Sequence, residues 1–430
     1  MKSFKPSIRS SVSLAIILAL ATITIAFAAS GDLDTTFSGD GKILQYFGEK
    51  GNYGSDLAIQ SDGKVVVAGY TQDARVWHDR DIVVARYDVN GSLDTTFSGD
   101  GWAVVRIPNQ SLVATAVAIQ SDGKIVVGGS ASYYVTDLIL IRFNPDGSLD
   151  TSFNGDGIAI VDADGKYNDC IDIVIQGTRI YVAGNYVDME KDLQDGIVYR
   201  FNKNGYLDKT FSKDGFLIVN FGKYDELYAL QLNSGKIYVT GTTSNTAGIN
   251  YDLIVARYND NGLPDFTFSD DGRIQTSLGG SDVGYDLVIN NGKTIVVGIS
   301  TDSFGNRGKM FLVQYTASGE LDLSFGTNGK VVTYLNFEEP ALEGVIIRDG
   351  KIIAVGRTND QNHPTDTLLV RYDANGNLDT TFGAGGIVTT TWPGVGTYYS
   401  VAAKNARIYA VGYYMGKNGT TRLILAAYKP

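Results

Sequence analysis

The chain has 430 residues, a charged fraction of 19% and a formal net charge of −11. This length exceeds that of an average single core but suits a repeat architecture. An acidic chain repels phosphate backbones, which argues against nucleic acid as a partner. Glycine is abundant at 51 residues and proline scarce at 8, a mixture that favours short strands and tight turns.

The first residues predict a secretory signal peptide over residues 1–28. A positive n-region precedes an apolar stretch, Val12–Phe27, and the small residues of Ala26-Phe27-Ala28 form a cleavage site. We expect a mature chain of residues 29–430 that is secreted, periplasmic or bound to the cell surface. The alternative is a retained anchor, but the apolar stretch is short for a bilayer span and no second one follows. The mature chain is therefore expected to have no membrane span.

Internal repetition is the strongest signal in the chain. The anchor G-x-L-D-x-x-F-x-x-x-G occurs seven times, with Pro264 in place of Leu in one copy. The spacing of its phenylalanines runs from 56 to 60 residues. These phenylalanines are Phe37, Phe97, Phe153, Phe211, Phe268, Phe325 and Phe382.

Each unit contains four strand-like segments. In the first unit they are Lys42–Phe47, Asp56–Gln60, Lys64–Tyr70 and Asp81–Tyr87. The third segment opens with Lys or Arg and carries Gly five residues later in every copy. Four short strands in about 57 residues are typical of one propeller blade.

We therefore predict an all-β fold, a seven-bladed β-propeller with four antiparallel strands per blade. Radial stacking buries both apolar faces of each sheet, which a lone sheet cannot do. A linear β-solenoid is the alternative, although its coils are usually shorter. Residues 29–430 form one domain, and its closing blade combines residues 31–48 with 398–430. The N-terminal strand Lys42–Phe47 is expected to pair with Leu423–Tyr428.

The anchor motif resembles that of the delta-60 repeat family, bacterial repeat proteins assigned to β-propellers. The resemblance covers essentially all of residues 31–430. It implies a propeller fold and an exported or surface context, and it implies no catalytic residues.

The anchor aspartates and phenylalanines are interpreted as fold elements, because a residue required in all seven units is seldom a catalyst. The Asp can accept hydrogen bonds from backbone N–H groups two or three residues on. An Arg eight residues earlier can contact it in five units. At the seam Ala427 replaces that Arg, so we expect the closure to depend on backbone pairing and on Phe37.

Metal and cofactor sites are not expected. His78 and His363 are the only histidines and lie in polar loops, so a multi-histidine site is excluded. Asp88–Asp94 superficially resembles a calcium loop but lacks its ligand series and closing Glu. Cys170 is the only cysteine, so no internal disulfide can form, and we expect it to be buried.

The connections divide into two sets on opposite faces. The turns between the second and third segments and the anchor turns are alike in every unit, and they lie on one face. The connections between the third and fourth segments and between the first and second segments differ from unit to unit, and they lie on the other face. Binding is usually carried by variable loops on a rigid scaffold, so we place a ligand site on the variable face. Its candidate ligand-binding residues are aromatic: Trp77, Tyr133, Tyr134, Tyr186, Trp392, Tyr398 and Tyr413.

Two functions remain open. The first is a non-catalytic extracellular binding or scaffold module for a glycan, peptide or protein, since aromatic platforms suit such ligands. The alternative is a glycoside hydrolase or lyase that uses paired carboxylates on the same face. We expect a monomer.

Overall fold

The computed structural model describes residues 29–48, 51–72, 79–162, 165–246, 250–302, 308–335, 339–358 and 366–430. The predicted signal peptide, Trp77 and both histidines lie outside these residues. The described part consists of strands and turns and contains no helix. No described segment is thus a helix that could cross a membrane.

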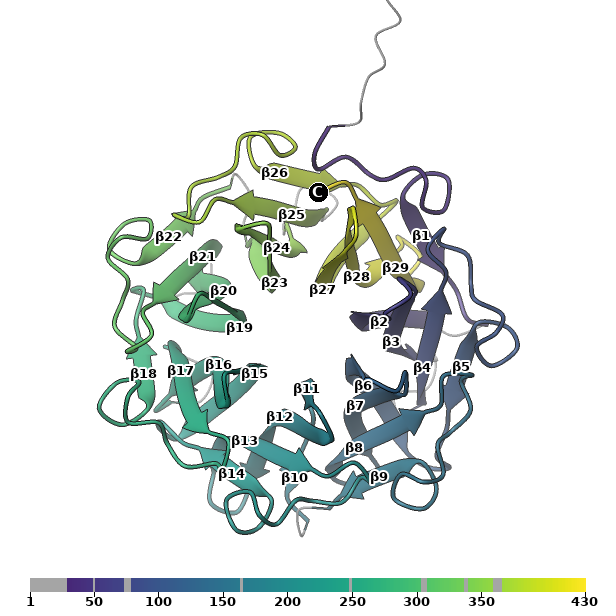
Figure 1. Cartoon of the computed structure of the whole chain (residues 1–430), viewed down its shortest axis with the longest axis horizontal. Coiled ribbons are helices and arrows are strands. Elements are labelled where there is room, and N and C mark those ends of the chain that lie inside the picture. The colour runs from purple at the N-terminus through teal and green to yellow at the C-terminus, as the bar shows by residue number, and fades with distance from the viewer. Residues whose placement is uncertain are drawn as a thin grey trace, which may run out of the picture.

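Short antiparallel sheets stand around a central axis (Figure 1). The innermost strands are β2 (Gly51–Ile59), β6 (Ser111–Ile119), β11 (Asp172–Gln176), β15 (Tyr224–Asn233), β19 (Ser281–Asn290), β23 (Ala341–Arg348) and β27 (Val395–Lys404). The second strands are β3 (Val65–Gln72), β7 (Ile125–Ser132), β12 (Arg179–Asp188), β16 (Lys236–Ser244), β20 (Lys293–Thr301), β24 (Lys351–Arg357) and β28 (Arg407–Met415).

The third strands are β4 (Arg80–Tyr87), β8 (Thr136–Phe143), β13 (Leu193–Phe201), β17 (Asp252–Asn259), β21 (Gly308–Tyr315), β25 (Thr367–Tyr372) and β29 (Thr421–Tyr428). The outermost strands are β5 (Trp102–Val105), β9 (Ile158–Val161), β14 (Phe216–Val219), β18 (Arg273–Thr276), β22 (Lys330–Thr333), β26 (Ile387–Thr390) and β1 (Lys42–Gln45). A further short strand, β10 (Tyr167–Asn168), extends the edge of β12 beside β11.

Five of these sheets have four strands each, and one sheet has nine. The nine-stranded sheet consists of a unit β10–β14 and a unit β15–β18. A single parallel pair, Gln194 with Tyr224, joins the two units. The four-stranded unit is therefore the repeated element of the fold.

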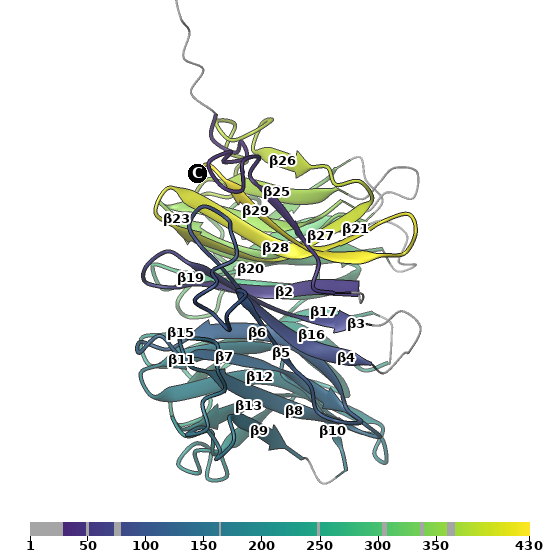
Figure 2. The ribbon, with the colours of Figure 1, turned by 90° about the vertical axis from the view of Figure 1, so that its right-hand side faces the viewer.

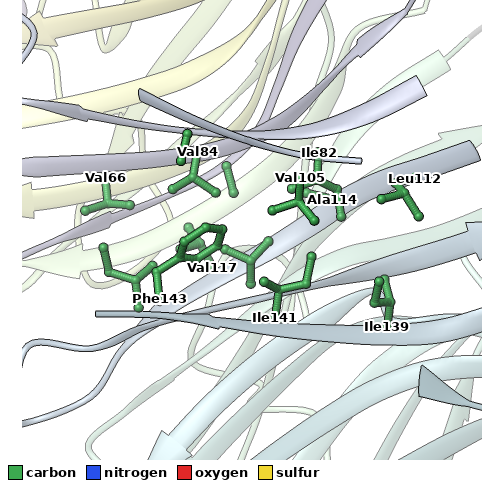
Figure 3. Packing of buried hydrophobic residues seen from close by; sticks show 14 of the residues in the cluster. Val66, Ile82, Val84, Val105, Leu112, Ala114, Val117, Ile139, Ile141 and Phe143 are labelled. Carbon is green, nitrogen blue, oxygen red and sulfur yellow. The ribbon is translucent and has the colours of Figure 1, made fainter. Parts of the chain in front are cut away.

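The core lies between neighbouring sheets, because alternate side chains of a strand point to opposite faces. In β4, Ile82 and Val84 pack against β6–β8 (Figure 3). The intervening Val83 and Ala85 pack on the other side, against β28 and β29. Both faces of the strand are covered, which explains its continuous apolar sequence.

The anchor motif is a structural turn, as predicted. All seven anchor phenylalanines are at most 1% exposed. Asp94 accepts hydrogen bonds from the backbone N–H of Thr96 at 3.1 Å and from Arg86 Nε at 2.6 Å. Lys64, the first residue of the predicted third segment, adds its Nζ at 2.8 Å. The same constellation recurs around Asp150, Asp265 and Asp379.

Each anchor turn also contacts the turn of the next sheet. Ser98 N donates to Asp146 O at 2.7 Å, and equivalent bonds link each neighbouring pair along the described chain. In the last of them, Gly383 N donates to Ser30 O at 2.9 Å. The series therefore continues from the C-terminal part of the chain to its N-terminal part.

The N- and C-terminal strands share one sheet. β1 pairs antiparallel with β29 from Lys42–Ala426 to Gln45–Leu423, the ladder that the repeat phase predicts. Figures 1 and 2 place the C-terminus beside the start of the described chain.

The expectation that closure depends on backbone pairing and on Phe37 leaves out a side-chain contact. Arg407 Nε of β28 contacts Asp34 Oδ2 at 2.5 Å, and its Nη2 donates to Thr36 Oγ1 at 2.6 Å. Its Nη1 donates to Val89 O in the turn of the next sheet. An Arg on the second strand thus occupies the place of the Arg that Ala427 lacks.

Candidate ligand site at the central axis

A β-bulge interrupts most of the innermost strands near their middle. In β2 the register against β3 shifts between Gly54 and Asp56, so Ser55 is left unpaired. The shift pushes the carbonyl of Tyr53 towards β3, where a Cβ on Gly69 would lie 1.8 Å from that oxygen. The same approach, at 1.8 to 2.0 Å, occurs at the matching glycine of every second strand. The repeated glycine is therefore the partner of the bulge, and the bulge re-aims its own side chain.

The residues at the bulge position differ from sheet to sheet although the backbone repeats. In chain order they are Ser55, Thr115, Ile171, Tyr228, Tyr285, Glu343 and Tyr399. The residue after the matching glycine also varies, as Tyr70, Ser130, Asn185, Thr242, Ile299, Arg357 and Tyr413. Large aromatic and charged residues occupy one side of the axis, and small or aliphatic ones the other.

These positions enclose a cavity of about 380 Å³ on the axis. Its walls include Tyr70, Tyr228, Tyr285, Tyr399 and Glu343 on one side. The opposite side is formed by Val113, Thr115, Ala116 and Ile171. The volume lies within the usual range of small-molecule sites, which is about 300–1,000 Å³.

Four tyrosines from two adjacent sheets form a continuous row beside the cavity. Tyr53 stacks on Tyr70 with ring centroids 4.6 Å apart, and Tyr399 stacks on Tyr413 at 5.8 Å. Tyr53 and Tyr413 join the two pairs at 5.1 Å. Burial raises the pKa of Tyr70 to about 12, so its hydroxyl is neutral at physiological pH.

A half-buried ion pair lies next to this row. Glu343 pairs with Arg357, whose charge acts on the neighbouring Tyr285 hydroxyl. Burial raises the pKa of Glu343, and the charge of Arg357 only partly opposes that effect. Further round the axis, Glu226 accepts hydrogen bonds from the Tyr228 hydroxyl and from Gln194 Nε2. Burial likewise raises the pKa of Asp169 to about 6.

Three half-buried aspartates follow the bulge in alternate sheets. Asp56, Asp172 and Asp286 each accept a hydrogen bond from the next sheet, from the backbone N–H of Val117, Leu230 and Val345 at 2.7–2.8 Å. The intervening sheets carry Ala116, Ala229 and Gly344 at this position. Burial raises the pKa of Asp172 to about 7. These carboxyl groups link neighbouring sheets through hydrogen bonds, and they also line the cavity.

The predicted aromatic residues lie in different places. Tyr413 belongs to the axial row. Tyr133 and Tyr134 are 61% and 82% exposed, and Tyr133 borders a separate cavity of about 310 Å³ beside Arg106. Tyr186 borders a third cavity, of about 430 Å³, with Asp195 and Tyr199. Tyr186 and Tyr413 lie within the strands β12 and β28.

Two predicted ligand-binding residues are core side chains. Trp392 is 3% exposed and donates its Nε1 to Thr367 Oγ1 at 3.2 Å. Tyr398 is fully buried, with its hydroxyl 2.8 Å from that of Tyr428. Neither ring has a free face, so both are removed from the candidate set.

Sequence reasoning missed the residues at the centre of the cavity, notably Tyr70, Tyr285, Glu343 and Arg357. They lie inside apolar strands, where an aromatic residue is ordinarily interpreted as core. The signal that could have found them is the residue directly after the repeated glycine, once the seven units are aligned.

The four-stranded units, the anchor turns and the axial arrangement define a β-propeller repeat protein. Six segments, residues 60–97, 120–153, 179–211, 232–268, 289–325 and 348–382, match the model of DUF5122, a β-propeller domain of unknown function. The matches support membership of a β-propeller repeat family. No protein of curated function matches the sequence.

Solved structures with a similar fold have little sequence identity to this chain. The polysaccharide lyase Uly1 aligns with a TM-score of 0.51 at 11% identity, over 93% of this chain and 96% of that one. A protein of unknown function from Dyadobacter fermentans aligns at 0.46 and 9% identity, over 90% and 98%. Virginiamycin B lyase from Staphylococcus aureus aligns at 0.44 and 11% identity, over 90% and 98%. At these identities the likeness concerns the fold alone.

Proposed function

We propose that the chain is an exported, closed seven-bladed propeller of the delta-60 type whose variable face binds a ligand. The blade count is supported by the seven anchors and by the division of the nine-stranded sheet into two units. Closure is supported by the β1–β29 ladder and by the bond from Gly383 to Ser30. Export is supported by the leader-like residues 1–28.

The ligand site is the axial cavity with its tyrosine row, and the protein acts as a non-catalytic binding module. The observation that carries this proposal is that the side chains at the bulge positions differ between units, although the backbone repeats. Seven repeated backbones would fold equally well with seven similar side chains, yet these positions hold tyrosines, a Glu and small residues. A rigid scaffold whose side chains differ from unit to unit at only a few positions is typical of a binding protein.

Arrays of glycans and peptides, probed with the exported protein, test this function. Tyr413→Ala should abolish or strongly weaken binding, because it removes the ring that joins both tyrosine pairs, and its thermal midpoint should change little. Asp62→Ala, in a turn of the uniform face, is the matched control and should bind normally. Equal losses from both variants would contradict the axial assignment.

A hydrolase or lyase remains the second candidate, because carboxyl groups with raised pKa values line the same cavity. Product release from any array ligand, lost in Glu343→Gln, would identify the enzyme. The binding module predicts no product, since Glu343 is paired with Arg357 and Asp56, Asp172 and Asp286 are bonded to backbone amides.

A further inference from the structure

The hydroxyl groups of the tyrosine row are free for a ligand. Within the described residues, those of Tyr53, Tyr70, Tyr399 and Tyr413 make no hydrogen bond to protein, and none is sealed from solvent. A buried tyrosine usually finds a partner for its hydroxyl. A neutral hydroxyl both donates and accepts, so this row matches a ligand whose groups do the same.

The remaining polar groups of the cavity extend this pattern. Ser55 and Thr115 add hydroxyls, while Glu343 supplies acceptors and the neighbouring Arg357 supplies donors. The aromatic rings offer flat apolar faces beside these groups. A sugar combines both features, because hydroxyl groups surround its ring and its C–H groups form an apolar face.

The charged residues around the cavity indicate which class of sugar it accepts. Four carboxyl groups line the cavity, and none of its lining residues is a Lys, Arg or His. The nearest cation, Arg357, is already paired with Glu343. An anionic sugar would bring its charge into a poorly solvated site that offers no free cation, and burying an unpaired charge is costly.

We propose that the axial cavity recognises a neutral saccharide unit and rejects uronic-acid and sulfated glycans. This inference rests on the proposed binding function and assigns its ligand class. The tyrosine hydroxyls and Glu343 hydrogen-bond the sugar hydroxyls, and the tyrosine rings cover an apolar sugar face. Glu343 also sets the charge selectivity, because it neutralises Arg357.

Calorimetric titration of the exported protein tests the assignment. The probes are neutral gluco-, galacto- and manno-oligosaccharides, a uronic-acid disaccharide, a sulfated disaccharide, and choline as an organic cation. At least one neutral oligosaccharide should bind, and the anionic probes should bind at least tenfold more weakly. Tyr399→Phe and Tyr413→Phe keep the ring and remove the hydroxyl, so each should weaken binding about 3- to 10-fold. Tyr206→Phe, on an exposed tyrosine of an anchor turn, should change nothing.

Glu343→Gln provides the sharpest variant. It leaves Arg357 without its counter-ion, so affinity for the uronic-acid disaccharide should rise while affinity for the neutral sugar falls. Preference of the wild type for an anionic probe, or binding of choline without any neutral sugar, overturns the assignment. Binding of array peptides alone, still lost in Tyr413→Ala, would overturn the ligand class and leave the binding function standing. If no ligand depended on Tyr413 for binding, both the ligand class and the binding function would be overturned.

Discussion

Single carboxyl groups in this fold are tuned in opposite directions by their surroundings. Burial opposes ionisation of Asp94, yet hydrogen bonds from Lys64 and Thr96 and the charge of Arg86 hold its pKa well below the usual range. Asp172 has no cation beside it, so burial dominates and raises its pKa to about 7. The same residue type therefore stabilises the turns as an anion and lines the axis largely as an acid.

These shifts predict how stability depends on pH. A carboxyl whose pKa rises on folding binds more protons when folded, so stability falls as pH rises from about 4 to about 7. A carboxyl whose pKa falls on folding loses its contribution as pH drops below about 4. The free energy of unfolding should therefore peak between about pH 4 and 6.

Chemical denaturation at pH 5.0 and 7.5 measures this effect. Wild type should be less stable at the higher pH by about 1–4 kcal/mol. Asp172→Asn, which keeps an acceptor for Leu230 N and cannot ionise, should flatten that difference. A wild type that is more stable at pH 7.5 than at pH 5.0 would show that the axial carboxyls are ionised without cost.

At the scale of the strand, the sheet that holds both chain ends shows how an Arg on the second strand takes the role of an Arg on the third. In four sheets a Lys at the first residue of the second strand or directly before it, and an Arg on the third strand, share one anchor Asp. The terminal sheet instead has Arg407 and Ala427, and Arg407 alone reaches Asp34, Thr36 and the next turn. One side chain on the second strand thus makes the contacts that the Arg of the third strand makes elsewhere, as Arg86 does with Asp94, Thr96 and Pro145 O.

This exchange can be reversed experimentally. Arg407→Lys should destabilise the chain by about 1–3 kcal/mol, because Lys cannot donate to all three partners and buried acceptors are left without a donor. The double variant Arg407→Lys with Ala427→Arg restores the pattern of the other sheets and should recover most of that loss. Thermal unfolding of the three variants gives the comparison. A double variant less stable than the single one would mean that the seam has a different geometry.

At the scale of the whole molecule, the N- and C-terminal strands lie within one sheet. The β1–β29 ladder and Phe37 tie residues 31–48 to the C-terminal strands. A strand that completes a sheet also removes an exposed edge. The N-terminal segment is therefore part of the core and not an appendage.

Deletion of residues 31–48 should lower the stability of the entire domain. The loss should exceed about 5 kcal/mol, since burial of one core phenylalanine is already worth about 3–5 kcal/mol. Hydrogen exchange should accelerate in sheets far from the seam as well as in β29. Leu44→Ala, an exposed position of β1, is the control and should change little. Faster exchange confined to β29, with an unchanged melting temperature, would contradict a cooperative ring.

The sequence by itself determined the repeated unit, the anchor turns, the strand phase and the pairing of the chain ends. These features follow from local rules repeated seven times: Asp accepting from its own turn, Phe in the core and alternating apolar residues. The start of β2 was missed, because the bulge at Ser55 breaks the alternation that marks a strand. Only the tertiary structure decided that Trp392 and Tyr398 are core, that Arg407 substitutes at the seam, and that Tyr70, Tyr285, Tyr399 and Glu343 meet at one cavity. Their common location depends on the arrangement of the sheets around a central axis, which brings together residues far apart in the sequence.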